Sequence, residues 1–397
     1  MSQLRKPLVA GSAAVLLAAG AVAFTLAGSS GHSAAGSHPA VKHSAVKTAS
    51  PAKVKSAQLA DSACTGPAGT AFIAEPGYSA FDGINTANCA FINDYNVDDP
   101  QVPGDSGDYN YSSSPQGVAL HGSTLYITDT AQNNVSVIDV ATMTTKNYNP
   151  AETDIHVGWQ PTGLAVSPDG TQLWVANSGP QTDSNLASIS VIDTATNTVT
   201  TTLHPGSAPA EIAFSPSGST AYVTTADGLL IYSTANDNVI GRIGNLGDPH
   251  DVVVSPDGNT LYVTNTDQGI VDVISTAGFP HVTRTIPVGQ MPWGLALSPS
   301  GGTLYAANIN SNSVSVISTS SDTVTSTLSV SGGPDVLAVT PDGSELLVTG
   351  ITSAILTVIS TSTGDVVGTT NLGGDGANSG DGNDPSGIVI STAVLPS

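Results

Sequence analysis

Short segments in which apolar or β-branched residues alternate with polar ones recur along the chain after about residue 60. Examples are Leu-Tyr-Val-Thr-Asn at 261–265 and Val-Ser-Val-Ile at 314–317. Alternation with a period of two is typical of half-buried β-strands. Turn sequences such as Ser-Pro-Asp-Gly at 167–170 separate the segments, and in them Pro fixes φ while Gly accepts a positive φ. The pattern predicts an all-β protein with short strands and tight turns.

The strand pattern repeats, and a proline opens each repeat. The prolines are Pro115, Pro161, Pro209, Pro249, Pro292, Pro334 and Pro385. Six repeats occupy 385 − 115 = 270 residues, so one repeat has 45 residues on average. Four predicted strands in about 45 residues are the size of one β-propeller blade.

Three motifs resemble the YVTN β-propeller repeat family, which includes prokaryotic surface-layer and secreted proteins. They are Leu-Tyr-Val-Thr-Asn at 261–265, Leu-Trp-Val-Ala-Asn at 173–177 and Val-Ile-Asp-Thr-Ala-Thr-Asn at 191–197. The resemblance covers about 115–391, and 70–97 more weakly. It implies a propeller fold but no particular reaction, because the motifs are structural.

The two ends of the repeat region complement each other. Six whole repeats run from 115 to 384, and the seventh stops after one strand at 387–391. Its three missing strands are predicted within 70–97, near the other end. We therefore expect a seven-bladed β-propeller of four-stranded antiparallel blades, closed by a C-terminal inner strand that completes an N-terminal blade. Such closure removes open sheet edges, which otherwise invite aggregation.

The charge of the chain is unevenly distributed. Of 9 basic residues six precede residue 60, whereas all 31 acidic residues follow it, so residues 61–397 carry 3 − 31 = −28. A nucleic-acid partner is excluded on this ground, because neutralising phosphates requires many Lys and Arg. Electrostatic docking on anionic lipid is disfavoured for the same reason. With 39% hydrophobic residues, the region 61–397 can bury the core of a single propeller domain.

The N-terminal region predicts export. Arg5 and Lys6 precede an apolar run, so residues 1–27 are expected to be a signal peptide, and the alternative is an uncleaved signal anchor. The run is mostly Ala and Gly, which favours cleavage and no stable membrane insertion afterwards. Residues 28–60, rich in Ser, Ala, His and Lys, are predicted to be a flexible linker. In a secreted or cell-surface protein, Cys64 and Cys89 are expected to form a disulfide.

Candidate acid, base or metal-binding residues follow the opening prolines of two neighbouring repeats. The residue two positions after the proline is Glu211 in one repeat and Asp251 in the next, whereas four other repeats have Gly there. His250 precedes Asp251, and the resemblance places these positions near the mouth of the central channel. Such a cluster can bind a divalent cation or act as acid and base, and Asp335 is a further candidate neighbour. The alternative is ordinary polar lining of a water-filled channel.

Two acidic loops, 98–114 and 373–384, are candidate sites for Ca²⁺ or another divalent cation, since Ca²⁺ prefers many oxygen ligands. Their candidate ligands are Asp98, Asp99, Asp105, Asp108, Asp375, Asp381 and Asp384. Solvated acidic loops without metal are the alternative. The Asn that ends many second strands is expected to cap the next turn rather than bind metal. Trp159 and Trp293 are expected to pack between blades, with stacking on a flat ligand as the alternative.

The sequence contains no Gly-x-Ser-x-Gly elbow, no phosphate-binding Gly-Lys-Ser/Thr loop and no His-Glu-x-x-His. The first hypothesis is therefore an exported binding or interaction module, a monomer whose ligand is an extracellular protein, a glycan or a cation, and not an enzyme. The rival is a metal-dependent lactonase-like hydrolase or lyase whose catalytic residues are Glu211, His250 and Asp251. A redox propeller with haem or quinone ranks third, because no haem-attachment motif is present.

Overall fold

The computed structural model of the chain describes residues 69–75, 80–86, 90–96, 114–141, 144–145, 154–180, 183–351, 353–372 and 386–391. All of them belong to one compact unit, Ala63–Ser397. The expected signal peptide (1–27), linker (28–60) and cysteine pair lie outside the described residues, and these three assignments remain predictions.

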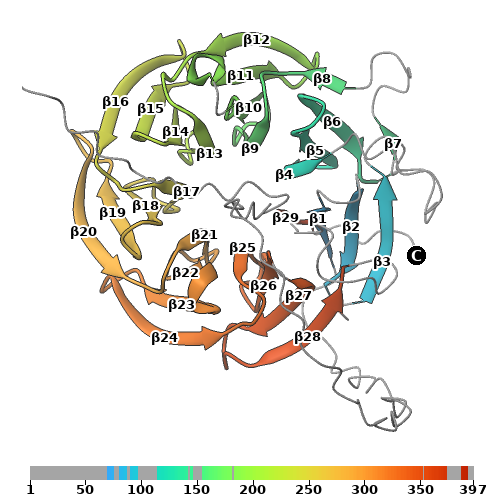
Figure 1. Ribbon diagram of the computed structural model, residues 1–397, viewed down its shortest axis with the longest axis vertical. Coiled ribbons are helices and arrows are strands. Elements are labelled where there is room, and N and C mark those ends of the chain that lie inside the picture. Colours follow the sequence, from blue (N-terminus) through green and yellow to red (C-terminus); the bar gives the residue numbers. More distant parts are fainter. Residues whose placement is uncertain are drawn as a thin grey trace, which may run out of the picture. The chain divides into compact units, whose positions relative to one another are not determined.

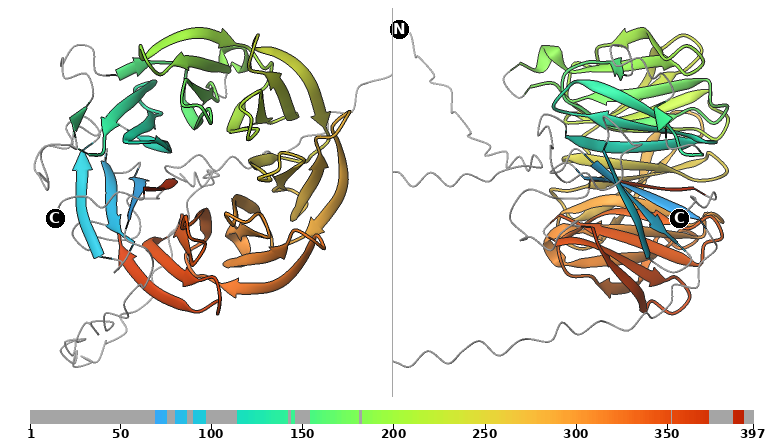
Figure 2. Two further views of the ribbon diagram at one scale, coloured as in Figure 1. Left: turned by 180° about the vertical axis from the view of Figure 1, so that it is seen from behind. Right: turned by 90° about the vertical axis from the view of Figure 1, so that its right-hand side faces the viewer.

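Seven antiparallel sheets surround a common centre in this unit, which is a seven-bladed β-propeller (Figures 1 and 2). Blades 2 to 6 have four strands each, counted from the centre outward. Blade 2 contains β9 (Pro161–Val166), β10 (Gln172–Asn177), β11 (Ser188–Asp193) and β12 (Thr198–Leu203), and blade 3 contains β13 (Pro209–Phe214), β14 (Thr220–Thr225), β15 (Gly228–Ser233) and β16 (Asn238–Gly244). Blade 4 contains β17 (Pro249–Val254), β18 (Thr260–Asn265), β19 (Ile270–Ser275) and β20 (His281–Pro287), and blade 5 contains β21 (Pro292–Leu297), β22 (Thr303–Asn308), β23 (Ser313–Ser318) and β24 (Thr323–Ser329). Blade 6 contains β25 (Pro334–Val339), β26 (Glu345–Gly350), β27 (Ser353–Ser360) and β28 (Val366–Asn371).

Blade 1 departs slightly from the four-strand pattern. Its strands are β4 (Pro115–His121), β5 (Thr124–Asp129), β6 (Asn134–Asp139), β7 (Thr144–Thr145) and β8 (Asp154–His156). Both short strands, β7 and β8, pair with β6, so together they take the place of one outer strand. Within the described ranges, the helices are two three-residue 3₁₀ turns, Ser184–Leu186 and Ile309–Ser311, and no helix is long and apolar enough to cross a membrane.

Blade 7 closes the ring as the sequence predicted. Its strands are β29 (Gly387–Ser391), β1 (Thr70–Glu75), β2 (Ala80–Asn85) and β3 (Ala90–Asn96). The C-terminal strand β29 is the innermost and pairs antiparallel with β1, from Thr70 opposite Ser391 to Ala74 opposite Gly387. Figure 1 shows the red β29 beside the blue β1 at the centre of the ring.

The core lies between the blades, because each sheet covers its faces with its two neighbours. At the junction of blades 4 and 5, Tyr262, Val271 and Ile286 pack with Leu295 and Leu304. Comparable apolar clusters join every other pair of neighbouring blades in the described part of the chain, including the closing blade 7. Burying one such aliphatic side chain contributes about 1.5–3 kcal/mol, so the ring is held mainly by these junctions.

A β-bulge stands at the start of the inner strands of blades 1 to 6. In blade 4, Pro249 lies opposite Asn265 and Val252 opposite Val263, so His250 and Asp251 together face a single partner residue. The same register shift occurs in the other five. A bulge bends its strand and re-aims side chains. The candidate residues of the sequence analysis therefore leave the regular ladder.

Candidate functional site

The inner strands are tied together by a threonine near the end of the second strand. The Thr264 hydroxyl accepts the backbone N–H of Asp251 at 2.8 Å and donates to the Trp293 carbonyl of the next blade at 3.2 Å. Thr224 likewise accepts the N–H of Glu211 at 2.9 Å and donates to the His250 carbonyl at 2.7 Å. The sequence analysis missed this role, although its signal is the Thr of the Leu-Tyr-Val-Thr-Asn motif.

Asp251 connects two blades through its carboxylate. One oxygen, Oδ1, accepts the N–H of Val252 at 2.7 Å, and the other, Oδ2, accepts the N–H of Leu295 in β21 of blade 5, also at 2.7 Å. Burial raises the pKa of Asp251 to about 6, and these two backbone N–H groups oppose the rise. Asp251 is therefore both a candidate acid or base and a structural link.

Glu211 lies against the preceding blade. A Cβ atom on Gly163 of β9 would overlap the Glu211 carboxylate, so the glycine leaves room for this side chain. Burial, and then the negative charge of Asp251, raise the pKa of Glu211 to about 8, while an N–H bond from Ile212 opposes the rise. Glu211 is consequently protonated at neutral pH and can donate a proton.

His250 stacks on the indole of Trp293 in blade 5, with ring centroids 3.6 Å apart and an angle of 27° between the planes. Its Nδ1 atom is buried and has no hydrogen-bond partner. Burial lowers the pKa of His250 to about 3, so the imidazole is uncharged at neutral pH. The packing interpretation of Trp293 is thus confirmed, whereas the Trp159 side chain is 55% exposed.

Glu211, His250 and Asp251 each keep a partly exposed surface, even though protein atoms surround them closely enough to shift their pKa values. The fourth candidate, Asp335, is buried and accepts the N–H of Val336 at 2.8 Å and the hydroxyl of Thr349 at 3.1 Å. Both of these bonds lie within blade 6.

No metal centre forms among the residues that the structure describes: no three or more His, Cys, Asp or Glu side chains come together as a possible ligand set. The candidates near the channel lie on the inner strands of two neighbouring blades. Glu211 on β13 and Asp251 on β17 interact as two carboxyl groups, and His250 on β17 stacks on Trp293. The loop candidates Asp98, Asp99, Asp105, Asp108, Asp375, Asp381 and Asp384 lie outside the described residues and remain predictions.

Asp129 and Asn265, which end the second strands of blades 1 and 4, cap the turns that follow, as expected: Asp129 Oδ1 accepts the N–H of Gln132 at 3.0 Å, and Asn265 Oδ1 accepts that of Gln268 at 3.1 Å. Asn308 accepts the N–H of Gly289 at 3.0 Å and donates to the Ser315 hydroxyl at 3.0 Å. Asn177 donates to the hydroxyl of Ser190 at 3.0 Å. Asn308 and Asn177 thus bond to the preceding inter-blade loop or to the third strand of their own blade, and Asn177 Oδ1 is buried without a hydrogen-bond partner among the described residues.

The sequence model of the Choice-of-anchor I domain family matches residues 84–300, more than half of the 397 residues. The chain belongs to the choice-of-anchor I domain family. The YVTN resemblance implied the correct fold, and the family whose model matches is the Choice-of-anchor I domain family. No curated protein matches this choice-of-anchor I protein.

Solved structures share the fold of this choice-of-anchor I protein at low sequence identity. Periplasmic gluconolactonase PpgL of Pseudomonas aeruginosa is 17% identical with a TM-score of 0.61, covering 82% of this chain and 99% of its own. A functionally unknown protein of Desulfotomaculum acetoxidans DSM 771 is 15% identical with a TM-score of 0.63 and coverages of 81% and 98%. Hydrazine synthase of Kuenenia stuttgartiensis is 20% identical with a TM-score of 0.59 and coverages of 72% and 90%. At these identities the likeness concerns the fold alone.

Proposed function

We propose that this choice-of-anchor I protein is an exported binding or interaction module at the cell surface or in the medium. The observation that carries the proposal is the use of Asp251: both of its carboxylate oxygens accept backbone N–H groups, one of them from the next blade. A carboxylate so engaged supports a rigid ring better than it serves a substrate. The expected signal peptide and the name of the family agree with a surface location.

The chemistry of the surface limits the partner. The described residues include only two cations, Arg242 and Arg284, on a domain whose sequence charge is −28. We therefore propose an extracellular protein, a glycan or a cation as the ligand, and not a nucleic acid. A rigid propeller is suited to this role, because its loops are presented on a preformed scaffold and lose little entropy on binding.

A lactonase-like hydrolase or lyase is the second candidate, and one observation favours it. Burial and Asp251 keep Glu211 protonated at neutral pH, which is the state required of a general acid. The fold is also that of a periplasmic gluconolactonase, at 17% identity. In this reading Glu211 donates the proton and the indole of Trp293 holds His250 in place.

One set of measurements tests both candidates on the exported chain. Cell fractionation and saturable pelleting with purified cell-wall glycan support the binding module, provided that a panel of lactones and esters shows no turnover with or without Ca²⁺ or Zn²⁺. Turnover that is lost in Glu211→Gln but kept in the control Asp257→Asn, which lies in an exposed turn, would contradict the binding module and support the hydrolase. A chain found only in the cytoplasm contradicts both.

A further inference from the structure

Four polar side chains come together where three strands of blade 1 meet. They are Asp129 at the end of β5, Asn134 and Ser136 on β6, and Asp154 on β8, and we call them the blade 1 cluster. Asp129 lies opposite Asn134 in the strand register. Asp154 lies opposite Ser136, two residues further along β6, so all four side chains share one face of the sheet. Asp129, Asn134 and Ser136 are at most 3% exposed, and Asp154 is half-buried.

Both carboxylate oxygens of Asp154 bond to β6. Its Oδ2 accepts the side-chain N–H of Asn134 at 3.0 Å, and its Oδ1 accepts the hydroxyl of Ser136, also at 3.0 Å. Burial raises the pKa of Asp154, and the bond from Ser136 opposes the rise. The negative charge of Asp129 raises the same pKa further, while His156 lowers it. The two carboxylates of the cluster are therefore close enough to repel each other.

The amide of Asn134 is satisfied on one side only. Its Nδ2 donates to Asp154, but its Oδ1 is buried and has no hydrogen-bond partner within the described ranges. A buried acceptor in a native fold needs a partner, and an ordered water or an ion takes this role where the protein supplies none. The Asn134 oxygen therefore indicates a bound species beside two carboxylates.

The other repeats show which residues the fold alone requires here. In blade 2 the second strand ends with Asn177 instead of Asp129, and the outer-strand position of Asp154 is occupied by Thr202. Blades 4 and 5 have Asn and Thr at these positions too. Blade 2 also has a buried amide oxygen without a described partner, that of Asn177. Blade 1 differs from the repeat by two carboxylates placed beside such an oxygen.

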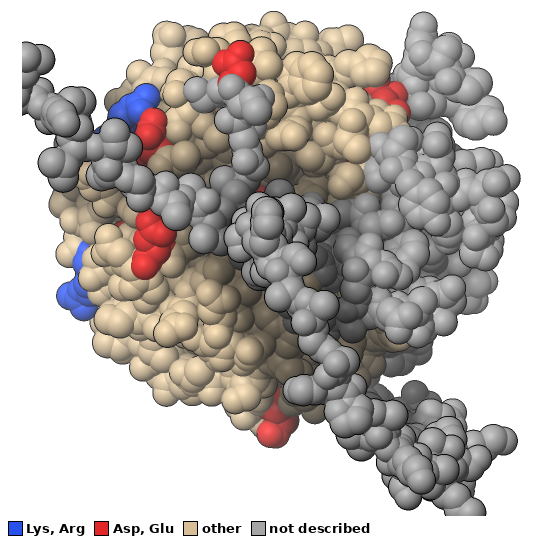
Figure 3. All heavy atoms as spheres, in the orientation of Figure 1, with Lys and Arg blue, Asp and Glu red and all other residues tan. Residues whose placement is uncertain are grey.

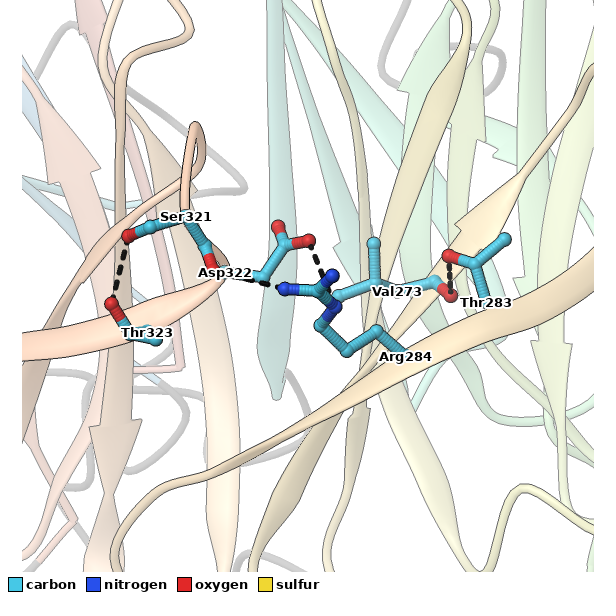
Figure 4. Close-up of polar contacts among 6 residues, drawn as sticks. All are labelled: Val273, Thr283, Arg284, Ser321, Asp322 and Thr323. Atoms are coloured by element: carbon cyan, nitrogen blue, oxygen red, sulfur yellow. Dashed lines mark hydrogen bonds and ion pairs between the residues drawn. The ribbon is translucent and has the colours of Figure 1, made fainter.

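The described part of the chain supplies no Lys or Arg to Asp154. Its two Arg residues, Arg242 on β16 and Arg284 on β20, lie across the ring from blade 1 (Figures 1 and 3). Arg284 shows how a carboxylate is balanced elsewhere, because its Nε lies 3.6 Å from Asp322 Oδ2 and its Nη1 donates to the Ser321 carbonyl at 3.1 Å (Figure 4). Asp154 has no such counterpart among the described residues, so a small cation can take that place.

We propose that the blade 1 cluster binds a Ca²⁺ ion, with the carboxylates of Asp129 and Asp154 and the amide oxygen of Asn134 as ligands. Ca²⁺ takes roughly six to eight oxygen ligands from carboxylates, amide or backbone carbonyls and waters. The described residues bring no third carboxylate or imidazole to the site, so waters complete the shell. Ser136 positions Asp154 through its hydrogen bond. The ion supplies the contact that the Asn134 oxygen lacks and offsets the charge of Asp154.

The position of the cluster shows what the ion stabilises. Ile138, two residues after Ser136 on the same face of β6, packs with Phe72 of β1. The cluster therefore lies at the junction of blades 1 and 7, beside the blade that joins the two ends of the propeller. The ion strengthens this junction and takes no part in the partner binding or the reaction proposed above. The inference is independent of both.

Calorimetric titration and thermal unfolding of the exported chain, stripped with EDTA and supplied with CaCl₂, test the proposal. We expect a Kd of about 0.1–1 mM, the range of extracellular Ca²⁺ sites. The melting temperature should rise with Ca²⁺, because the unfolded chain lacks the site. Any divalent cation also screens a domain of charge −28, so Mg²⁺ at the same concentrations is the reference and should raise the melting temperature less.

Three variants locate the ion. Asp154→Asn keeps an acceptor for Ser136 but removes the charge, and it should weaken Ca²⁺ binding about tenfold or more. Asp129→Asn places in blade 1 the residue that blades 2, 4 and 5 carry, so the fold tolerates it, and it should weaken binding by a similar factor. Asp139→Asn, on the same strand but on its other face, is the matched control and should leave the Kd unchanged.

Three results overturn the proposal. Absence of both heat and a melting shift at about 10 mM Ca²⁺ assigns the Asn134 oxygen to water. Equal shifts with Ca²⁺ and Mg²⁺ show screening alone. Ca²⁺ binding that Asp154→Asn and Asp129→Asn retain, and that Asp381→Asn removes, places the ion in the loop 373–384 instead.

Discussion

Replacing Glu211 with Gln should make the protein more stable at neutral and alkaline pH. The Glu211 carboxyl is desolvated and faces the negative charge of Asp251, and both effects raise its pKa to about 8 from 4.5. The folded state therefore holds a proton that the unfolded state releases. Its stabilising contribution is complete below about pH 4.5 and is lost as the pH rises towards 8. Gln cannot ionise, so the stability of the variant does not fall with rising pH on account of position 211.

The magnitude follows from the shift. One pKa unit corresponds to about 1.36 kcal/mol, and at pH 7 the gap of 7 − 4.5 = 2.5 units gives roughly 3 kcal/mol at most. Glu211 keeps a partly exposed surface, so solvent reduces this to about 1–2 kcal/mol. Asp251, whose pKa rises to about 6, acts in the same direction. His250 acts in the opposite direction, because its pKa falls to about 3 and its contribution is lost as the pH drops below 6.5.

Urea unfolding of wild type and Glu211→Gln between about pH 5 and pH 8 measures the effect. We expect the two curves of unfolding free energy to diverge as the pH rises, with the variant above the wild type. Asp257→Asn is the matched control: hydrogen bonds from Ser255 and Asn259 lower the pKa of Asp257, so its contribution is lost at acid pH instead. Parallel curves, or a variant less stable than wild type at pH 8, would refute the reasoning.

Three further predictions concern the links within and between blades. Asn308→Ala should lower the free energy of unfolding by about 2–4 kcal/mol in urea, because it leaves buried backbone and hydroxyl groups unpaired. Gly294→Ala should lower the melting temperature by several degrees, since a Cβ atom there would overlap the carbonyl oxygen of Asp335 in the next blade. Arg284→Gln should cost less than about 1 kcal/mol in thermal unfolding, because Arg284 is 58% and its partner Asp322 21% exposed.

Controls for these variants come from the same repeats. Asn236→Ala changes an exposed Asn and Gly302→Ala adds a Cβ atom whose nearest neighbour lies at 3.5 Å, so both should leave stability nearly unchanged. An Asn308→Ala protein as stable as wild type would show that the bonds of Asn308 to Gly289 and Ser315 do not stabilise the fold. If Gly294→Ala has the same melting temperature as Gly302→Ala, the inner strands of neighbouring blades can move apart at no cost. A loss of more than about 2 kcal/mol in Arg284→Gln would contradict the expectation that solvent weakens the Arg284–Asp322 ion pair.

Local patterns in the sequence were sufficient for the architecture. Period-two alternation, Pro-Asp-Gly turns and the 45-residue repeat located the strands, and the single strand after Pro385 predicted the pairing of β29 with β1. The capping role of Asn265 was also predictable, because its side chain accepts the N–H of Gln268, three residues further along the chain. The strands, turns and caps depend on interactions within one repeat, and the repeat itself displays them many times.

The tertiary structure alone decided what the central side chains do. Asp251 accepts an N–H from Leu295, 44 residues away, and His250 lies on Trp293, so both roles depend on how closely two blades approach. The pKa of Glu211 depends equally on burial between blades and on a carboxylate from the next one. Hydrogen-bond reach and desolvation are set by distances of a few ångströms across a junction, which one-dimensional spacing does not contain.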